Sequence, residues 1–432
     1  MDFFPVHLRI ALQYLKLIHA GNHPTVQFAC SGNHIYNLPF FRQDSTMARI
    51  KICFFCSLGS FDTGMPISTF KLIQHFSAHP DFQVFVILPS EGELAKRIRQ
   101  CGIEPRIVAF YRFRSPHRFL SFIRFMATVP LAFVRVVYYL RVNDMEIIHF
   151  SDLIDAPFYL CGRLAAVKTV AHLRYCLENA AARLLFRLVT DVFIDNVVCI
   201  SNAVLRYAGL KRPRAAVIYN PGPDPALFDP LKKTAAALPL PDNGAIVLTI
   251  GKFVRAKGHE HFVRMAQTIE TRHPGLCRYV ILGEAVPARR EYFTKIQRLI
   301  TSFSLNEKII LIDNLPHERV ADLLARTAVF AHLPNYQEGL GGVLLEALAM
   351  EVPVVAFDCG GIGECFTNAV SGFLVTQYDV EAAADRVVQL LIDGDLRKRM
   401  GAEGRKEVLS RFSYQKHFSE IETIYRSFFK NR

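Results

Sequence analysis

The feature that most constrains the fold is residues 329–356, which read VFAHLPNYQEGLGGVLLEALAMEVPVVA. The apolar run 329–333 ends at Pro334 and predicts a buried strand, and residues 352–356 predict a second strand. Between them lie a polar loop and a run of apolar residues at helical spacing. A strand, a helix and a second buried strand in this order indicate a parallel sheet that is covered by helices.

The loop of this unit carries a possible ligand site. Residues 338–342 read EGLGG, and Glu346 follows about one turn into the helix. A helix N-terminus presents unpaired N–H groups and partial positive charge, and glycines there let a phosphate or sugar oxygen approach the backbone. The alternative is a glycine-rich helix end beside two solvated glutamates. Because both features share one strand–loop–helix turn, we favour a ligand site.

The same alternation of strands and helices occurs twice. In 432 residues, of which 51% are hydrophobic, there is room for two domains. Residues 231–243, rich in lysine, alanine and proline, read as a linker between them. The fold class we predict is α/β, with parallel sheets covered by helices on both faces. The predicted strands are residues 50–56, 84–88, 105–110, 146–150, 168–171, 197–200 and 216–219, then 245–250, 278–282, 309–312, 329–333, 352–356 and 372–375.

Charge and cysteine usage restrict the partners. The net charge of +12 favours anionic partners, namely nucleotides, nucleic acid or an anionic membrane surface. Cys53 and Cys56 form a C-x-x-C string, but they lie within a predicted strand, and no second ligand pair for zinc follows. We therefore expect core thiols, a reducing compartment and no metal site. The sequence contains no P-loop, nucleophile elbow or RNA-binding module, so we expect no nucleic-acid partner.

Two stretches of the first half do not fit the alternation. Residues 1–48 form an N-terminal extension that matches neither a signal peptide nor a membrane span, and we hypothesise that translation starts at Met47 and that residues 1–46 are dispensable. Residues 112–141 are dense in phenylalanine, leucine and valine, yet they carry arginines that make a transmembrane helix a poor interpretation. Two interpretations stay open, a core helix with solvated arginines or a basic, aromatic surface against anionic lipid. These arginines are Arg112, Arg114, Arg118, Arg124, Arg135 and Arg141.

Further candidate residues follow the ends of predicted strands. Lys252, Arg255 and Lys257 lie in the loop 251–258, where mobile positive charge beside a helix N-terminus suits a diphosphate, although an exposed lysine-rich loop is equally compatible. Residues 358–364, DCGGIGE, indicate backbone placed against a ligand or a domain cleft. His149 and His172 each lie at a strand end on the ligand edge of the first sheet, which raises the odds that they are functional. Ser201, Asp393 and Ser413 are predicted helix N-caps.

From about residue 50 to its C-terminus, the chain resembles glycosyltransferase family 4, the retaining nucleotide-sugar enzymes of GT-B architecture with two facing Rossmann-like domains. The strongest match is the spacing of Glu338 and Glu346, with Gly339, Leu340 and Gly341 after the first glutamate. The loop with Lys252 and Lys257 is similar to the family's phosphate loop, and Gly64 falls where the family has a glycine turn. The resemblance implies an N-terminal acceptor domain (49–228), completed by a C-terminal helix (413–432), a linker (229–243) and a nucleotide-sugar domain (244–412).

The resemblance also implies roles for the residues. Glu338 and His172 would be catalytic residues near the transferred sugar, and Glu346 would bind the nucleotide ribose. The amides of Gly339, Leu340 and Gly341 would hold sugar hydroxyls or the β-phosphate. Lys252 and Lys257 would neutralise the leaving diphosphate, so no metal or other cofactor is expected. Gly64 would lie near the donor phosphates, with His149 and Arg255 as further possible site residues.

The implied function is retaining transfer of a sugar from a nucleotide-diphosphate sugar to a glycan or lipid-linked acceptor, as in cell-envelope polysaccharide or glycolipid synthesis. The implied location is cytoplasmic, with the membrane face as a possible peripheral site. Two departures from the family pattern matter, since Lys252 stands where many members have arginine and Leu340 where phenylalanine is commoner. The alternatives are a nucleotide-sugar epimerase or a phosphorylase on the same architecture, or an inactive, membrane-docked binding protein.

Overall fold

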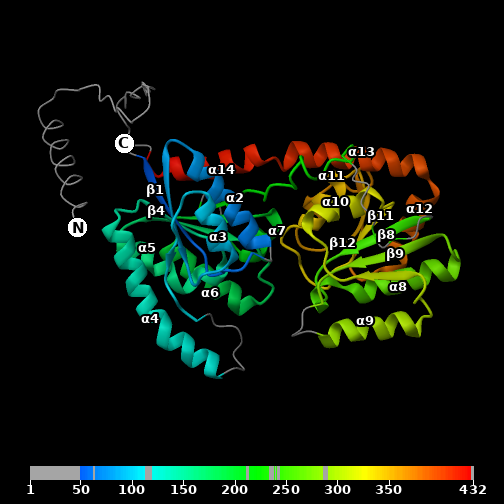
Figure 1. Cartoon of the computed structure of the whole chain (residues 1–432), viewed down its shortest axis with the longest axis horizontal. Coiled ribbons are helices and arrows are strands. Elements are labelled where there is room, and N and C mark those ends of the chain that lie inside the picture. The colour runs from blue at the N-terminus through cyan, green and yellow to red at the C-terminus, as the bar shows by residue number, and fades with distance from the viewer. Residues whose placement is uncertain are drawn as a thin grey trace, which may run out of the picture. The chain divides into compact units, whose positions relative to one another are not determined.

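The computed structural model describes residues 49–61, 64–111, 119–210, 214–232, 238, 240, 244–285 and 290–429. The predicted extension 1–48 with its start at Met47 lies outside the described residues, as do Arg112, Arg114 and Arg118 and most of the predicted linker. The described chain contains two parallel sheets (Figure 1).

The first sheet has seven strands in the order β3-β2-β1-β4-β5-β6-β7, and every pair that it contains is parallel. Its central strands are buried along nearly their whole length, because helices cover both faces. The strands are β1 (Ile50–Phe55), β2 (Phe82–Leu88), β3 (Arg106–Ile107), β4 (Ile147–Phe150), β5 (Lys168–Leu173), β6 (Asn196–Cys199) and β7 (Ala215–Val217).

Two apolar clusters lie on opposite faces of this sheet. One of them joins α4, α5, α6 and α7 to the sheet, and the other joins α2, α3 and α14 to it. The helices are α2 (Gly64–Ala78), α3 (Glu93–Gln100), α4 (Phe119–Val142), α5 (Tyr159–Ala165), α6 (Ala180–Phe193), α7 (Asn202–Ala208) and α14 (Tyr414–Ser427), with a 3-10 turn η1 (Leu153–Phe158) after β4.

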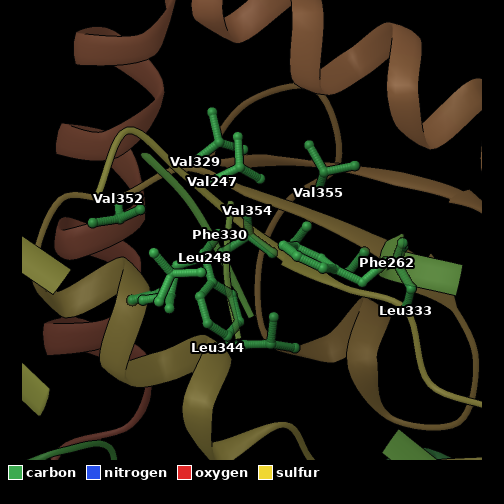
Figure 2. Close-up of a cluster of buried hydrophobic side chains, with 14 of the residues drawn as sticks. Val247, Leu248, Phe262, Val329, Phe330, Leu333, Leu344, Val352, Val354 and Val355 are labelled. Carbon is green, nitrogen blue, oxygen red and sulfur yellow. The ribbon is translucent and has the colours of Figure 1, made fainter. Parts of the chain in front are cut away.

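The second sheet has six parallel strands in the order β10-β9-β8-β11-β12-β13. Figure 2 shows part of its core, where Leu344 from α11 lies beside Phe330 and Leu248 from two neighbouring strands. The strands are β8 (Ala245–Ile250), β9 (Cys277–Leu282), β10 (Ile309–Ile312), β11 (Val329–His332), β12 (Val354–Asp358) and β13 (Gly372–Thr376). The helices are α8 (His259–Arg272), α9 (Arg290–Ser302), α10 (His317–Ala325), α11 (Gly342–Ala349), α12 (Val380–Ile392) and α13 (Gly394–Arg411).

The observed architecture confirms the predicted α/β fold and its repeated alternation. The strands β8 and β10 have the predicted bounds, whereas β3 is reduced to two residues and β5 continues two residues beyond its predicted end. The predicted N-caps are confirmed, since the side chains of Ser201, Asp393 and Ser413 each accept a hydrogen bond from a backbone amide three residues on. The sequence analysis assigned no helix to α5 or α6, whose outward faces are apolar.

The C-terminal helix α14 packs on the first sheet. Its residues Ile421, Ile424 and Tyr425 belong to the same cluster as α2 and α3, so the chain returns to its first domain after completing the second. Ser413 caps the helix where α13 ends, and Figure 1 shows the two helices in sequence. A helix that follows the second sheet in the chain therefore contributes to the core of the first.

Glu364 joins the two domains through a helix N-terminus. It ends the 3-10 turn η4 (Ile362–Glu364) after β12, and its carboxylate accepts hydrogen bonds from the amides of Asn202 and Ala203 at 2.8 and 2.7 Å. The side chains of Asn202 and Tyr219 donate to the same group, both at 2.9 Å. Because the first amides of a helix lack internal partners, a carboxylate from the other domain is well suited to this end of α7. The sequence analysis expected backbone of residues 358–364 against a ligand or a domain cleft, whereas here it is the side chain of Glu364 that contacts the first domain.

We expect Glu364→Ala to lower the free energy of unfolding by about 2–3 kcal/mol, because it leaves the amides at the start of α7 without their charged acceptor. Urea unfolding followed by circular dichroism measures this. Glu403→Ala is the matched control, since Glu403 pairs with Lys406 at an exposed site, and it should change stability by less than about 0.5 kcal/mol. Equal effects of the two substitutions would contradict this role of Glu364.

Candidate active site

Three loops meet at the carboxyl edge of the second sheet. They follow β8, β11 and β12, which are neighbours in the sheet. The first loop, 251–258, contains the 3-10 turn η2 (Arg255–Lys257), and the second leads into α11. The third loop, 359–361, leads into η4. Since open α/β sheets bind their ligands at this edge, the three loops form the candidate site.

A carboxylate that is bonded on both oxygens forms the centre of the site. The ammonium of Lys257 lies 2.7 Å from Oε1 of Glu338, and the hydroxyl of Tyr336 lies 3.0 Å from the same oxygen. On the other side, Nε2 of His332 lies 2.5 Å from Oε2 of Glu338, so this ring nitrogen carries the hydrogen. The Glu338 side chain is only 9% exposed, whereas that of Lys257 is 23% exposed and still reaches the surface.

The pairing fixes the charge of both groups. Burial alone would raise the pKa of Glu338, but Lys257 and His332 outweigh it and hold that pKa well below its usual range. Burial alone would lower the pKa of Lys257, but the Glu338 carboxylate and Tyr336 raise it. At neutral pH the site therefore holds an ionised carboxylate and a full ammonium charge. Glu338 cannot donate a proton in this state, and its carboxylate holds the ammonium of Lys257 at 2.7 Å.

The other two predicted cations lie further out. Lys252 forms an ion pair with Glu284 at 3.0 Å and is about one-third exposed. The side chain of Arg255 is exposed, and its backbone carbonyl accepts a hydrogen bond from Asn335 at 2.8 Å, which ties the first loop to the second. The structure thus brings Lys257 into the centre of the site and leaves Lys252 and Arg255 at its rim.

Close packing of backbone explains most of the loop glycines. A Cβ atom on Gly339 would lie 2.2 Å from the carbonyl oxygen of Arg174, a residue of the first domain. A Cβ atom on Gly361 would lie 2.2 Å from the carbonyl oxygen of Gly339, and one on Gly341 would meet the side chain of Leu344. Leu340, between them, packs against the apolar clusters of both domains. Among the three glycines of the predicted loop, only Gly342 faces open space, so the first domain takes up the room beside Gly339.

Glu346 lies on α11 one turn beyond the loop, as predicted. Its carboxylate is 3.1 Å from Nε2 of His317, at the start of α10, and this hydrogen bond is the main cause of the raised pKa of His317. The ring of His317 packs at 5.2 Å from that of Phe228. Glu346 is 19% exposed and so remains available to a ligand on its open side.

The carboxylate of Glu346 also interacts electrostatically with Lys71, a lysine of the first domain. Burial lowers the pKa of Lys71, on α2, while Asp224 and Glu346 partly oppose that shift. Lys71 donates a hydrogen bond to the hydroxyl of Tyr414 at the start of α14. Gly64 begins the same helix α2, and the space where its Cβ would stand is open. The predicted glycine turn is therefore at a helix N-terminus with room beside it.

The two predicted histidines form a buried chain with α14. His149 is fully buried inside β4, and its Nδ1 lies 2.6 Å from the hydroxyl of Tyr425, while its Nε2 lies 3.3 Å from Nδ1 of His172. Burial lowers the pKa of His149 to about 3 and that of His172 well below its usual value, with Arg174 as the next cause for both, so both rings are neutral. When the Tyr425 hydroxyl donates to Nδ1 of His149, the hydrogen of the His149 ring lies on Nε2 and is donated to Nδ1 of His172. The hydrogen of the His172 ring then lies on its own Nε2, which can donate to a ligand.

Both histidines lie next to last in their strands, near the predicted strand ends, but their surroundings differ. His149 lies within the sheet and contacts α14 rather than the ligand edge, because β4 and β5 are flanked on this face by the last helix of the chain. His172 is next to last in β5, and its Nε2 has no hydrogen-bond partner among the described residues. Of the two histidines, His172 is thus the one with a ring nitrogen that can still form a hydrogen bond to a ligand.

Sequence reasoning missed several residues of the site. His332 interrupts the apolar run of β11, and Tyr336 lies two residues before Glu338. For both residues, the sequence signal that could have predicted them as site residues was their position beside the loop. Lys71 and His317 lie on helices distant in sequence, and Arg174 is a buried cation at the end of β5. No sequence pattern connects these three to the loop, since only the packing of the domains brings them there.

The part of the chain that contains the three loops of the site is similar in sequence to known proteins. Residues 232–407 match the family model described as glycosyl transferases group 1. Alpha-D-kanosaminyltransferase of Streptomyces kanamyceticus is 29% identical over 185 residues, which are 43% of this chain and 46% of that protein. D-inositol 3-phosphate glycosyltransferase of Corynebacterium urealyticum is 29% identical over 222 residues, which are 50% of this chain and 52% of that protein. The chain thus spans about half the length of these relatives.

Solved structures share the fold over most of the chain. A glycosyltransferase from Rickettsia africae has a TM-score of 0.74 at 18% identity, covering 89% of this chain and 100% of that one. HepE from Anabaena, solved in complex with UDP, has a TM-score of 0.72 at 18% identity, covering 88% of this chain and 100% of that one. These similarities confirm the predicted two-domain GT-B architecture. The stretch 232–407 that matches the model of the group 1 glycosyl transferases holds Lys257, Glu338 and Glu346.

Proposed function

We propose that the protein transfers a sugar from a nucleotide-diphosphate sugar to an acceptor hydroxyl with retention of the anomeric configuration. The observation that carries the proposal is the ion pair of the half-buried Lys257 with the buried Glu338 at the carboxyl edge of the second sheet, beside the N-terminus of α11. An ammonium held there by a carboxylate is a preorganised positive charge for a diphosphate. HepE, one of the structural neighbours, has been solved with UDP-glucose, which supports a nucleotide sugar as the donor class.

In the proposed reaction, the bond between the anomeric carbon and the diphosphate oxygen breaks, and the acceptor oxygen bonds to the same face of that carbon. The departing diphosphate oxygen takes the proton of the acceptor hydroxyl. Lys257 and Lys252 stabilise the negative charge that develops on the diphosphate, so the transfer uses no metal ion. Both lysines are paired with glutamates in the described structure, so a bound diphosphate shares their charge with Glu338 and Glu284.

The remaining residues have proposed binding roles. Glu346 accepts hydrogen bonds from the ribose hydroxyls, and its bond to His317 holds it in place. His172 donates through Nε2 to a hydroxyl of the transferred sugar, because that nitrogen is the one end of the histidine chain without a partner among the described residues. The amides of Gly339, Leu340 and Gly341 and the N-terminus of α2 at Gly64 approach the donor from the two domains.

The proposed acceptor is a glycan or a lipid-linked saccharide in cell-envelope polysaccharide or glycolipid synthesis. One relative supports this class by name, a capsular polysaccharide biosynthesis glycosyltransferase of Staphylococcus aureus, which is 38% identical over 97 residues. Those 97 residues are 22% of this chain and 26% of that protein. We propose that the enzyme works in the cytoplasm at the membrane face, where a lipid-linked acceptor would lie.

A panel of UDP, GDP and ADP sugars tests the proposed reaction. Release of nucleoside diphosphate that depends on both a donor and an acceptor, and that persists in EDTA, is the expected result. Proton NMR of the product should show the anomeric configuration of the donor. Epimerisation of the sugar without release, or cleavage that requires inorganic phosphate, would identify the alternative enzymes on this architecture. No turnover and no nucleotide binding would indicate an inactive binding protein.

We expect Lys257→Ala to lower kcat about 10²–10³-fold, because it removes the ammonium that meets the leaving diphosphate. The rate of nucleoside diphosphate release at saturating donor measures the effect. Lys295→Ala is the control, since Lys295 is exposed on α9 and lies 3.9 Å from its nearest carboxylate, and it should retain the wild-type rate. A wild-type rate in a folded Lys257→Ala protein would refute the assignment.

We expect Glu346→Ala to raise the donor KM about 10–100-fold with a smaller change in kcat, because a ribose contact is present in both the bound and the transition state. Isothermal titration with UDP, GDP and ADP provides the binding constants. Glu291→Ala, at an exposed position of α9, controls for the loss of a surface carboxylate. If kcat falls and KM stays constant, Glu346 acts on the reacting atoms and not on the ribose.

A further inference from the structure

Three consecutive helices of the first domain expose an unusual number of large apolar side chains. The helices α4, α5 and α6 all pack on one face of the first sheet, and α5 contacts both of the others (Figure 1). The side chains that point outward include Leu131, Val134 and Tyr138 on α4, Leu164 on α5 and Leu185 and Leu188 on α6, and all but Leu164 are more than half exposed. We call the outward side of these three helices the α4–α6 face. Apolar patches of this extent mark interaction surfaces.

The other side of α4 shows that the helix lies along the domain. Ala132, Val136 and Leu140, one turn apart, are buried in the cluster beneath it. Residues 123–142 are long and apolar enough to cross a membrane, yet only 17% of that window is buried. The core-helix interpretation of this stretch thus accounts for the buried stripe of α4 but not for its exposed apolar stripe. Because one stripe of α4 is packed on the sheet while the opposite stripe is exposed, the geometry suits a helix lying in a membrane interface.

The charges on the α4–α6 face have one sign almost throughout. The three helices contain six arginines and a single acidic residue, Asp191. Two of the arginines also connect the helices, since Arg141 donates to the carbonyl of Leu164 at 2.5 Å and Arg163 donates to the carbonyl of Val192 at 3.1 Å. The face is therefore one connected surface of apolar side chains with positive charge between them.

We propose that the α4–α6 face docks on the surface of a bilayer that contains anionic lipid. Leucine and valine side chains would enter the boundary between headgroups and acyl chains, while the arginines would reach the lipid phosphates. A second copy of this chain fits less well, because a two-fold contact through this face would place six arginines against six others. A bilayer that contains anionic lipid supplies negatively charged headgroups and an apolar interior together. Binding to it does not require a surface that is complementary in shape to the α4–α6 face.

Docking by the α4–α6 face does not depend on the proposed sugar transfer. Only the consequence of docking for a lipid-linked acceptor rests on the proposed function. The face belongs to the domain that contributes His172, Lys71 and the N-terminus of α2 to the candidate site, so docking would hold that domain at the surface where a lipid-linked acceptor lies. Docking itself requires no donor sugar and no turnover. It can therefore be measured separately from sugar transfer.

Sedimentation of the full chain with vesicles tests the inference. At low salt, we expect the wild-type protein to bind vesicles of phosphatidylcholine and phosphatidylglycerol in equal parts at least about tenfold more tightly than vesicles of phosphatidylcholine alone, and to lose most of that preference at high salt. The double variant Leu185→Glu, Leu188→Glu should bind anionic vesicles at least about tenfold more weakly, because two charges replace two apolar anchors. Val134→Glu with Tyr138→Glu tests the same face on α4.

Ile392→Glu is the matched control, since Ile392 is exposed to the same extent as Leu185 but ends α12 in the second domain, and it should bind as the wild type does. Circular dichroism confirms that each variant is folded. Failure of the wild type to sediment, or equal binding by Leu185→Glu, Leu188→Glu and Ile392→Glu, would overturn the proposal. A wild-type dimer that the face variants convert to a monomer would show instead that the face binds a second copy. Nucleoside diphosphate release with a soluble acceptor, measured on the same variants, reports on transfer independently.

Discussion

The ion pair between Lys257 and Glu338 is the interaction on which the site depends. Burying a lone carboxylate costs several kcal/mol, so Glu338 is stable inside the protein only with its partners in place. Those partners come from the loops after β8 and β11, together with His332 at the end of β11. One carboxylate thus fixes the relative positions of two loops and holds an ammonium in the centre of the site.

The same loop couples the two domains. The carbonyl of Arg174 occupies the space beside Gly339, and the thiol of Cys176 donates to the carbonyl of Glu338. The glycine is therefore needed for contact between domains as well as for any approach of a ligand. Glu364, one strand further along the sheet, repeats this coupling at the start of α7. The shape of the loop 338–342 consequently depends on the position of the first domain.

The last helix connects the two domains in a second way. Tyr425 of α14 lies against His149, and through it the hydrogen-bond chain reaches His172. Tyr414, at the other end of the helix, accepts a hydrogen bond from Lys71. A residue that follows the second domain in the chain is thus hydrogen-bonded to a histidine in the first. The outward faces of α4, α5 and α6, on the opposite side of that sheet, are free of this constraint and expose apolar and basic side chains together.

By itself, the sequence determined the α/β class, most of the strands, the loop that carries Glu338 and the helix start that carries Glu346. Local patterns are sufficient for these features, because apolar periodicity and glycine spacing act over a few residues. It also indicated Lys257, since that lysine lies in the loop after a predicted strand. The pairing of Lys257 with Glu338, the burial of His149 and the approach of Arg174 to Gly339 were decided only by the tertiary structure. Each joins segments far apart in the chain, and the pKa of a group depends on the neighbours that packing supplies.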